Sequence, residues 1–245
     1  ISYNTASTAT KGYTLFYYGT KTADFITSAE TDQPMTTSES FKKNLNASDT
    51  TVAPTDFTRS KSVTYYATQL GKGDEIASYS ISFNTANDET KSYSKFYYGT
   101  KTAEQLAASE TDTAMTMSVS YKKTIGAATL SENPADFARS KSVTYYATQL
   151  GKGDEIADYS ISYNTGNTAT KSMSVFYYGT KTAGLLDASE TDLAMTTSES
   201  FKKNIGALAL SVVASDFTRS KSVTYYATQL GKGDEIADYS ISYNT

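Results

Sequence analysis

Cysteine, histidine and tryptophan are absent from this chain of 245 residues, which contains only 3 prolines. Without cysteine the chain can form neither a disulfide framework nor a thiolate site. Without histidine it lacks the most frequent general base and transition-metal ligand. A catalytic site could still be built from two carboxylates, but every acidic pair here occurs once in each copy of a repeat, which is not typical of one catalytic centre. The sequence therefore predicts no catalytic residues and a protein that is not an enzyme.

Strong charge and long apolar runs are missing as well. Lys and Arg number 22 against 26 Asp and Glu, so there is no basic surface to bind the phosphates of nucleic acid, and nucleic acid is not expected as a partner. No apolar run approaches the roughly 18 residues that a transmembrane helix needs. What the chain has instead is Ser, Thr, Ala and aromatic residues, with 21 Tyr and 10 Phe. This polar, β-compatible mixture favours an extracellular or cell-surface location.

A repeat organises the whole chain. The pentapeptide at 1–5 recurs almost unchanged from Ile81, Ile161 and Ile241, so successive copies start 80 residues apart without insertion or deletion. Residues 139–165 are identical to residues 219–245. We predict three tandem β repeats at 1–80, 81–160 and 161–245, the last including the five-residue start of a further repeat. The boundary of the structural unit need not coincide with this numbering, because the strand expected at 76–85 runs through the copy limit.

Alternation with period two predicts antiparallel strands in every copy. Tyr79, Ile81 and Phe83 share one face while the intervening serines share the other, the pattern of a half-buried strand. Strands at 63–70 and 76–85 flank a glycine-containing loop and predict one hairpin. A second hairpin is expected to pair 11–21 with 35–43 around a loop or a single helical turn at 23–32. The predicted fold class is all-β, with three tandem 80-residue antiparallel units of about two hairpins each.

The copies differ most at residues 44–55 and their equivalents. This segment is polar in the first copy and apolar in the third, where it reads Ala-Leu-Ala-Leu-Ser-Val-Val-Ala from Ala207. A segment that tolerates such change is predicted to be a surface loop. In the third copy the alternative is an assembly contact.

Acidic loops are the candidates for a metal site. Glu30, Asp32, Asp74 and Glu75 recur in each copy, and loop oxygen atoms are what Ca²⁺ requires. Their spacing matches neither an EF-hand nor a nonapeptide calcium repeat. We therefore expect solvated turn residues and no cofactor, with Ca²⁺ as the one cofactor that these loops would suit.

Three classes of protein fit these patterns. The first is an elongated array of β units: an extracellular structural or adhesive protein such as a fibre, filament, sheath or surface-layer component. The second is a closed, propeller-like threefold ring with multivalent, lectin-like glycan binding. The third is an outer-membrane β-barrel, against which Glu39 and Lys95 interrupt the apolar side of the strands. We favour the elongated array, because duplication with a strict period extends reach without altering the unit.

Both ends of the chain carry the same pentapeptide, and exposed strand edges invite strand addition from neighbouring chains. We therefore predict that Ile1, Tyr3, Ile241 and Tyr243 act in self-association or in contacts with neighbouring repeats. A surface glycan or a protein receptor is the other class of partner considered.

Overall fold

The computed structural model describes residues 1–3, 8–232 and 235–243. Within these residues the chain forms β-strands and short 3-10 turns, and no α-helix. The chain divides into two compact units, Ile1–Thr111 with Lys122–Phe137 and Asp112–Tyr121 with Ala138–Thr245. The division between the units falls inside the second copy and does not follow the copy limits.

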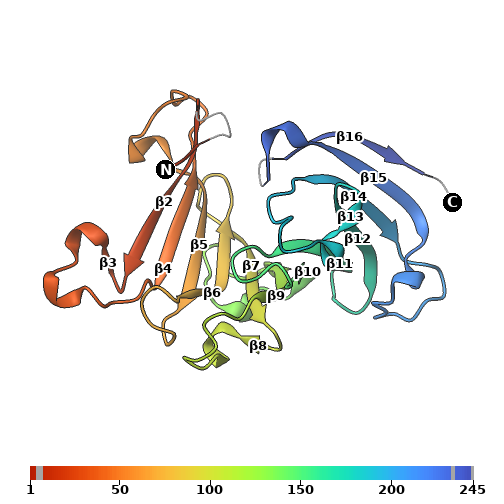
Figure 1. Cartoon of the computed structure of the whole chain (residues 1–245), viewed down its shortest axis with the longest axis horizontal. Helices are drawn as coiled ribbons and strands as arrows, with labels where there is room; N and C mark the ends of the chain where they lie inside the picture. Colours follow the sequence, from red (N-terminus) through yellow and green to blue (C-terminus); the bar gives the residue numbers. More distant parts are fainter. Residues whose placement is uncertain (4–7, 233–234, 244–245) are drawn as a thin grey trace. The chain divides into compact units, whose positions relative to one another are not determined.

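The first unit is an antiparallel sheet with the strand order β1-β2-β4-β5-β6-β7, seen from red to yellow in Figure 1. Two short strands, β3 and β8, pair with β2 and β7. The bounds are β1 Ser2–Tyr3, β2 Thr10–Tyr18, β3 Lys21–Thr22, η1 Ala23–Phe25, η2 Ser28–Glu30, β4 Thr37–Lys42, η3 Pro54–Asp56, β5 Arg59–Ala67, β6 Ile76–Phe83, β7 Thr90–Tyr98, β8 Lys101–Thr102, η4 Ala103–Gln105 and η5 Pro134–Asp136.

The second unit repeats the same elements in the order β9-β10-β11-β12-β14-β15-β16, and the short β13 pairs with β12. Figure 1 shows its last strands in cyan and blue. The bounds are β9 Met115–Lys122, β10 Arg139–Ala147, β11 Ile156–Tyr163, β12 Thr170–Tyr178, β13 Lys181–Thr182, η6 Ala183–Leu185, β14 Met195–Lys202, η7 Ala214–Asp216, β15 Arg219–Ala227, η8 Thr228–Leu230 and β16 Ile236–Ser242.

The strand order is open and the sheet is not closed. The predicted all-β, antiparallel, open array is confirmed, and the alternative of a closed threefold ring is wrong, because β1 and β16 remain the ends of the strand order. Both predicted hairpins are confirmed, since β5 pairs with β6 and β2 pairs with β4. The segment 23–32 holds two 3-10 turns, η1 and η2, where one helical turn or a loop was expected.

Cross-strand register separates an apolar face from a hydroxyl face. Val63 pairs with Ile81 and Ile81 with Tyr93, so their side chains lie on the same face of three neighbouring strands. On the opposite face Ser80 lies between Thr64 and Ser94. Alternation of apolar and hydroxyl residues in the sequence therefore maps directly onto the two faces of the sheet.

A β-bulge interrupts this alternation in the β5–β6 hairpin. Tyr65 pairs with Tyr79, but the next residue, Tyr66, pairs with Ala77, which leaves Ser78 as the extra residue. Ser78, Ile76 and Ile81 are all buried, although strict alternation would place Ile76 and Ile81 on opposite faces. The same shift occurs between Tyr145 and Tyr146 in β10 and between Tyr225 and Tyr226 in β15. In the β5–β6 and β10–β11 hairpins the bulge lets the end of the hairpin bury a second set of apolar side chains, among them Ile76 and Ile156.

The variable loop lies on the surface, as predicted, and covers part of the apolar face through one buried phenylalanine. Phe217, which directly follows the loop of the third copy, packs against Ile161 of β11 and Met173 of β12. In the middle of the loop, the backbone carbonyls of Ala209 and Ser211 accept from the buried hydroxyl of Thr170, at 3.3 and 2.8 Å. Because these acceptors are backbone atoms, the loop keeps its anchor while its side chains change.

Replacing Thr170 by valine should destabilise the fold by about 1–3 kcal/mol, since it removes a buried hydroxyl and leaves the carbonyl of Ser211 without this donor. Urea denaturation followed by circular dichroism measures the loss. Thr165→Val, at an exposed position near the same strand, is the control and should change little. An equal loss in both variants would show that the hydroxyl anchor is not the cause.

Candidate assembly site

A hydrophobic cluster at one end of the strands joins the second copy to the third. Three side chains come from the β10–β11 hairpin of the second copy, and three come from β12 and the segment after β13 in the third copy. The members are Ala147, Leu150, Ile156, Tyr178, Ala183 and Leu186. Ala183 is completely buried, with 0% of its surface exposed. We call this arrangement, together with the pairing of the adjacent strands, the copy junction.

Two hydrogen bonds fix the copy junction to backbone carbonyls. The hydroxyl of Tyr178 donates to the carbonyl of Ala157 at 3.0 Å, and Nε2 of Gln149 donates to the carbonyl of Ala183 at 2.7 Å. Burial raises the pKa of Tyr178 from 10.0 to about 12, so its hydroxyl stays a neutral donor well above physiological pH. β11 also pairs with β12 over Tyr159–Tyr163. The backbone ladder, the apolar cluster and the two side-chain bonds act on the same two copies.

The first unit contains the same junction between the first and second copies. Tyr98 donates to the carbonyl of Ala77 at 2.8 Å, and Gln69 donates to that of Ala103 at 2.6 Å. The equivalents of the apolar cluster are again buried: Ala67, Leu70, Ile76, Tyr98, Ala103 and Leu106. One junction chemistry is therefore used twice in the chain.

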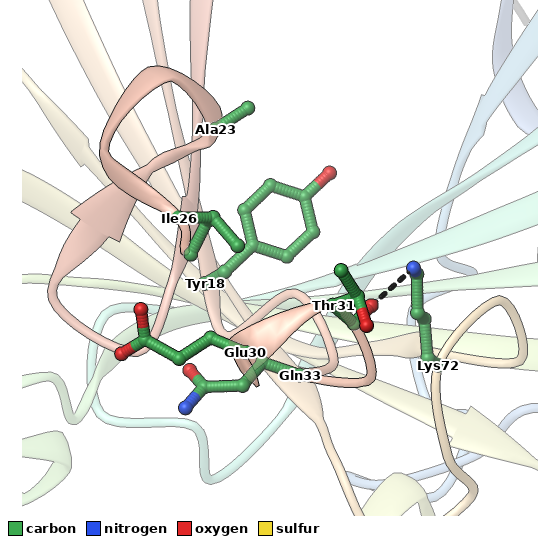
Figure 2. A pocket seen from close by; sticks show the side chains of 7 residues that line it. All are labelled: Tyr18, Ala23, Ile26, Glu30, Thr31, Gln33 and Lys72. Carbon is green, nitrogen blue, oxygen red and sulfur yellow. Dashed lines mark hydrogen bonds between the residues drawn. The ribbon is translucent and has the colours of Figure 1, made fainter. Parts of the chain in front are cut away.

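The first copy presents the receiving half of this junction without an inserted hairpin. Tyr18, Ala23 and Ile26 hold the positions that Tyr178, Ala183 and Leu186 hold in the third copy. Figure 2 shows them around a hollow of about 240 Å³. Its lining residues are Tyr18, Ala23, Ile26, Glu30, Thr31, Gln33 and Lys72. Ala23 is exposed here, whereas both of its equivalents are fully buried.

The third copy presents the inserting half, the β15–β16 hairpin. Ile236 is 62% exposed, whereas its equivalent Ile156, in an identical local sequence, is 6% exposed. Tyr239 and Ile241 of β16 are exposed as well. The two halves of a copy junction are therefore both present on the surface, one in each unit.

The residues predicted for assembly lie on the strands at the ends of the sheet order. Tyr3 belongs to β1, which pairs with β2, and Ile241 belongs to β16, which pairs with β15. Ile1 and Tyr243 flank these strands, and all four side chains are exposed. The two pairs lie in different units. Their role in assembly stays a prediction.

Two of the four acidic residues considered for calcium, Glu30 and Glu75, are held by hydrogen bonds from other groups. Glu30 bonds to the Lys21 ammonium at 2.7 Å and accepts from the Thr27 amide at 3.0 Å. Glu75 accepts from the amides of Met35 at 2.7 Å and Gly73 at 2.9 Å. Asp32 is exposed and Asp74 is half-buried. Within the described residues no group of three or more Asp or Glu side chains could hold a metal ion.

Glu30 gives a pH-dependent test of the loop structure. The hydrogen bond from Lys21, followed by the bonds from Thr27, lowers the pKa of Glu30 from 4.5 to about 2. Because the folded-state pKa is depressed, the stabilisation is complete above pH 4.5 and is lost as the pH falls towards 2. An NMR titration of the Glu30 carboxyl carbon should have its midpoint near 2, and Lys21→Met should move that midpoint up towards 4.5. A midpoint of 4.5 in the unaltered chain would contradict the pairing.

The sequence did not identify the residues that make the copy junction. Ala103 and Gln69 carry no chemical signature, and their importance follows only from their contacts across the copy limit. The available signal was the strict recurrence of Lys-Thr-Ala from Lys21 and of Thr-Gln-Leu-Gly from Thr68 in every copy.

Comparison of the chain with protein-family models, with curated proteins and with solved structures found no match. In the part of the chain that the structure describes, no helix is long and apolar enough to cross a membrane.

Proposed function

We propose that the chain is an extracellular structural or adhesive protein, a component of a fibre, sheath or surface layer, rather than an enzyme. Its copies are joined edge to edge, and each copy carries one variable loop. One observation carries the proposal: the same junction joins the first copy to the second and the second to the third. A unit that can be joined to a copy of itself through the same contacts suits extension better than a single binding or reaction centre.

The distribution of variation supports this role. Residues 139–165, which supply the inserting hairpin, are identical to residues 219–245, while the loop after β14 differs between copies. Leu208, Leu210 and Val213 of this loop are exposed in the third copy. The array thus keeps its junctions constant and changes what it presents, which suits contacts with a surface or a receptor.

Adding a copy tests the proposal. Insertion of a second copy of residues 81–160 adds four long strands, equivalent to β6, β7, β9 and β10. At about 4.8 Å per strand, the sheet grows by at most about 19 Å along the direction of strand pairing. Small-angle scattering should show a longer particle of unchanged cross-section, with one increment per inserted copy. An increase in cross-section at constant length would contradict a structural array.

A glycan array separates a purely structural role from an adhesive one. A purely structural array should give no binding that scales with the number of copies. Strong binding to one glycan, rising with each added copy as expected for multivalency, would contradict a purely structural role and favour the adhesive one.

A further inference from the structure

We propose that this chain binds a second copy of itself head to tail, with the β15–β16 hairpin of one molecule docking on the β2–η1 surface of the next. The internal copy junctions identify which segment binds this surface. The β10–β11 hairpin, which fills the corresponding surface of the third copy, has the same sequence as β15–β16. This inference rests on the proposed function as an array, and it adds a specific partner, a surface and a register.

The internal pairing of β6 with β7 defines the register of the docked strands. There Tyr79 pairs with Lys95, Ser80 with Ser94 and Ile81 with Tyr93. β16 is the equivalent of β6 in the third copy, and β2 is the equivalent of β7 in the first copy. The same register therefore places Tyr239, Ser240 and Ile241 of one molecule against Leu15, Thr14 and Tyr13 of the next. The ring centroids of Tyr79 and Tyr93 lie 5.3 Å apart, so the ring of Tyr239 is expected to contact the ring of Tyr13 in the same way.

The hairpin would also fill the hollow in Figure 2. Ile236 would enter beside Ala23 and Ile26, as Ile156 packs with Ala183 and Leu186. Gln229 would donate to the carbonyl of Ala23, as Gln149 donates to that of Ala183. The docked hairpin therefore removes apolar side chains of both molecules from water.

β1 already occupies part of the docking edge. Ser2 pairs with Gly12 and Tyr3 with Thr10, in the register by which Ser82 and Phe83 pair with β7. Ser242 and Tyr243 of an incoming β16 would take the same places. β1 therefore competes with the second molecule, and removal of residues 1–3 should strengthen association.

At one position the docked surfaces would bring like charges together. In the second unit Asp158 accepts from the amide of Gly184 at 3.0 Å, and a Cβ atom at Gly184 would lie 3.3 Å from that carboxylate. At the docking surface Asp238 would instead meet Asp24, which brings two like charges together. Association should therefore be weaker than an internal junction, should rise with salt, and should tighten in Asp24→Gly.

Sedimentation velocity over a concentration series tests the proposal with single substitutions in the complete chain. Ala23→Arg blocks the receiving surface and Ile236→Arg blocks the inserting hairpin, and both positions are exposed, so the fold should persist. Ala53→Arg, at an exposed position in the variable loop, is the matched charge control. Circular dichroism confirms that each variant is folded.

The unaltered chain and Ala53→Arg should form concentration-dependent oligomers, whereas each blocked variant alone should sediment as a 26.5 kDa monomer. An equimolar mixture of Ala23→Arg and Ile236→Arg should form dimers and stop there, because only one pair of complementary surfaces remains. Removal of residues 1–3 and Asp24→Gly should each lower the concentration at half association at least tenfold.

A chain that stays monomeric even after removal of residues 1–3 together with Asp24→Gly would overturn the docking proposal. Oligomers that persist in both blocked variants would overturn it as well. Neither result bears on whether an added internal copy lengthens the particle, so failure of the docking proposal is distinguishable from failure of the proposed function.

Discussion

Replacing Ile161 by alanine should lower the free energy of unfolding by about 2–5 kcal/mol. The side chain is 1% exposed and packs with Met173 and Phe217, so truncation leaves a cavity between β11, β12 and the segment that precedes β15. Urea denaturation followed by circular dichroism measures the change.

The repeat supplies a control at an identical local sequence. Ile241 has the same neighbours in the chain as Ile161 but is 41% exposed, because β16 lacks a paired strand on its outer side. Ile241→Ala should therefore cost much less than Ile161→Ala. Equal losses at the two positions would mean that the packing of Ile161 against β12 and Phe217 does not stabilise the fold.

Replacing Phe217 by alanine should cost about 3–5 kcal/mol. Its ring is 2% exposed and covers Ile161 and Met173, so its loss opens the apolar face of the second unit to water. Thermal unfolding and hydrogen exchange of β11 and β12 would both detect the change.

Leu208, in the same loop, is the control for Phe217. It is 81% exposed, so Leu208→Ala should leave stability nearly unchanged. A large loss in Leu208→Ala would show that the apolar loop of the third copy packs against the protein. A small loss in Phe217→Ala would show that the loop does not cover the sheet.

Much of the fold could be predicted from the sequence, because both the repeat and the alternation of apolar with hydroxyl residues can be read directly from the order of the residues. Tyr79, Ile81 and Phe83 alternate with serine, and this pattern identified the strand and its buried face. The bulge at Ser78 could not be predicted, because an extra residue in one strand shows only when its partner is known. For this reason the burial of Ile76 together with Ile81 was not expected.

The candidate site could be predicted only in part, because burial of its residues depends on contacts with another copy of the repeat. Ile156 and Ile236 have the same local sequence, yet one is buried and the other exposed, because burial depends on whether the next copy is present. Local sequence therefore cannot separate a filled junction from an unfilled one. The shared pentapeptide at the two ends pointed to β1 and β16, but not to Ala23 or Gln229.

Amide hydrogen exchange in β11 and β16 tests most directly whether the copies are joined by backbone pairing. The exposed substitution Asp238→Glu gives the otherwise identical peptide from β16 a distinct mass, and Ala23→Arg keeps the molecules apart. Over Tyr159–Ser162 β11 pairs with β10 on one edge and with β12 on the other, so these amides should be protected. About half of the β16 amides face its open edge and should exchange within seconds. Equal protection of the two strands in the monomer would contradict the account.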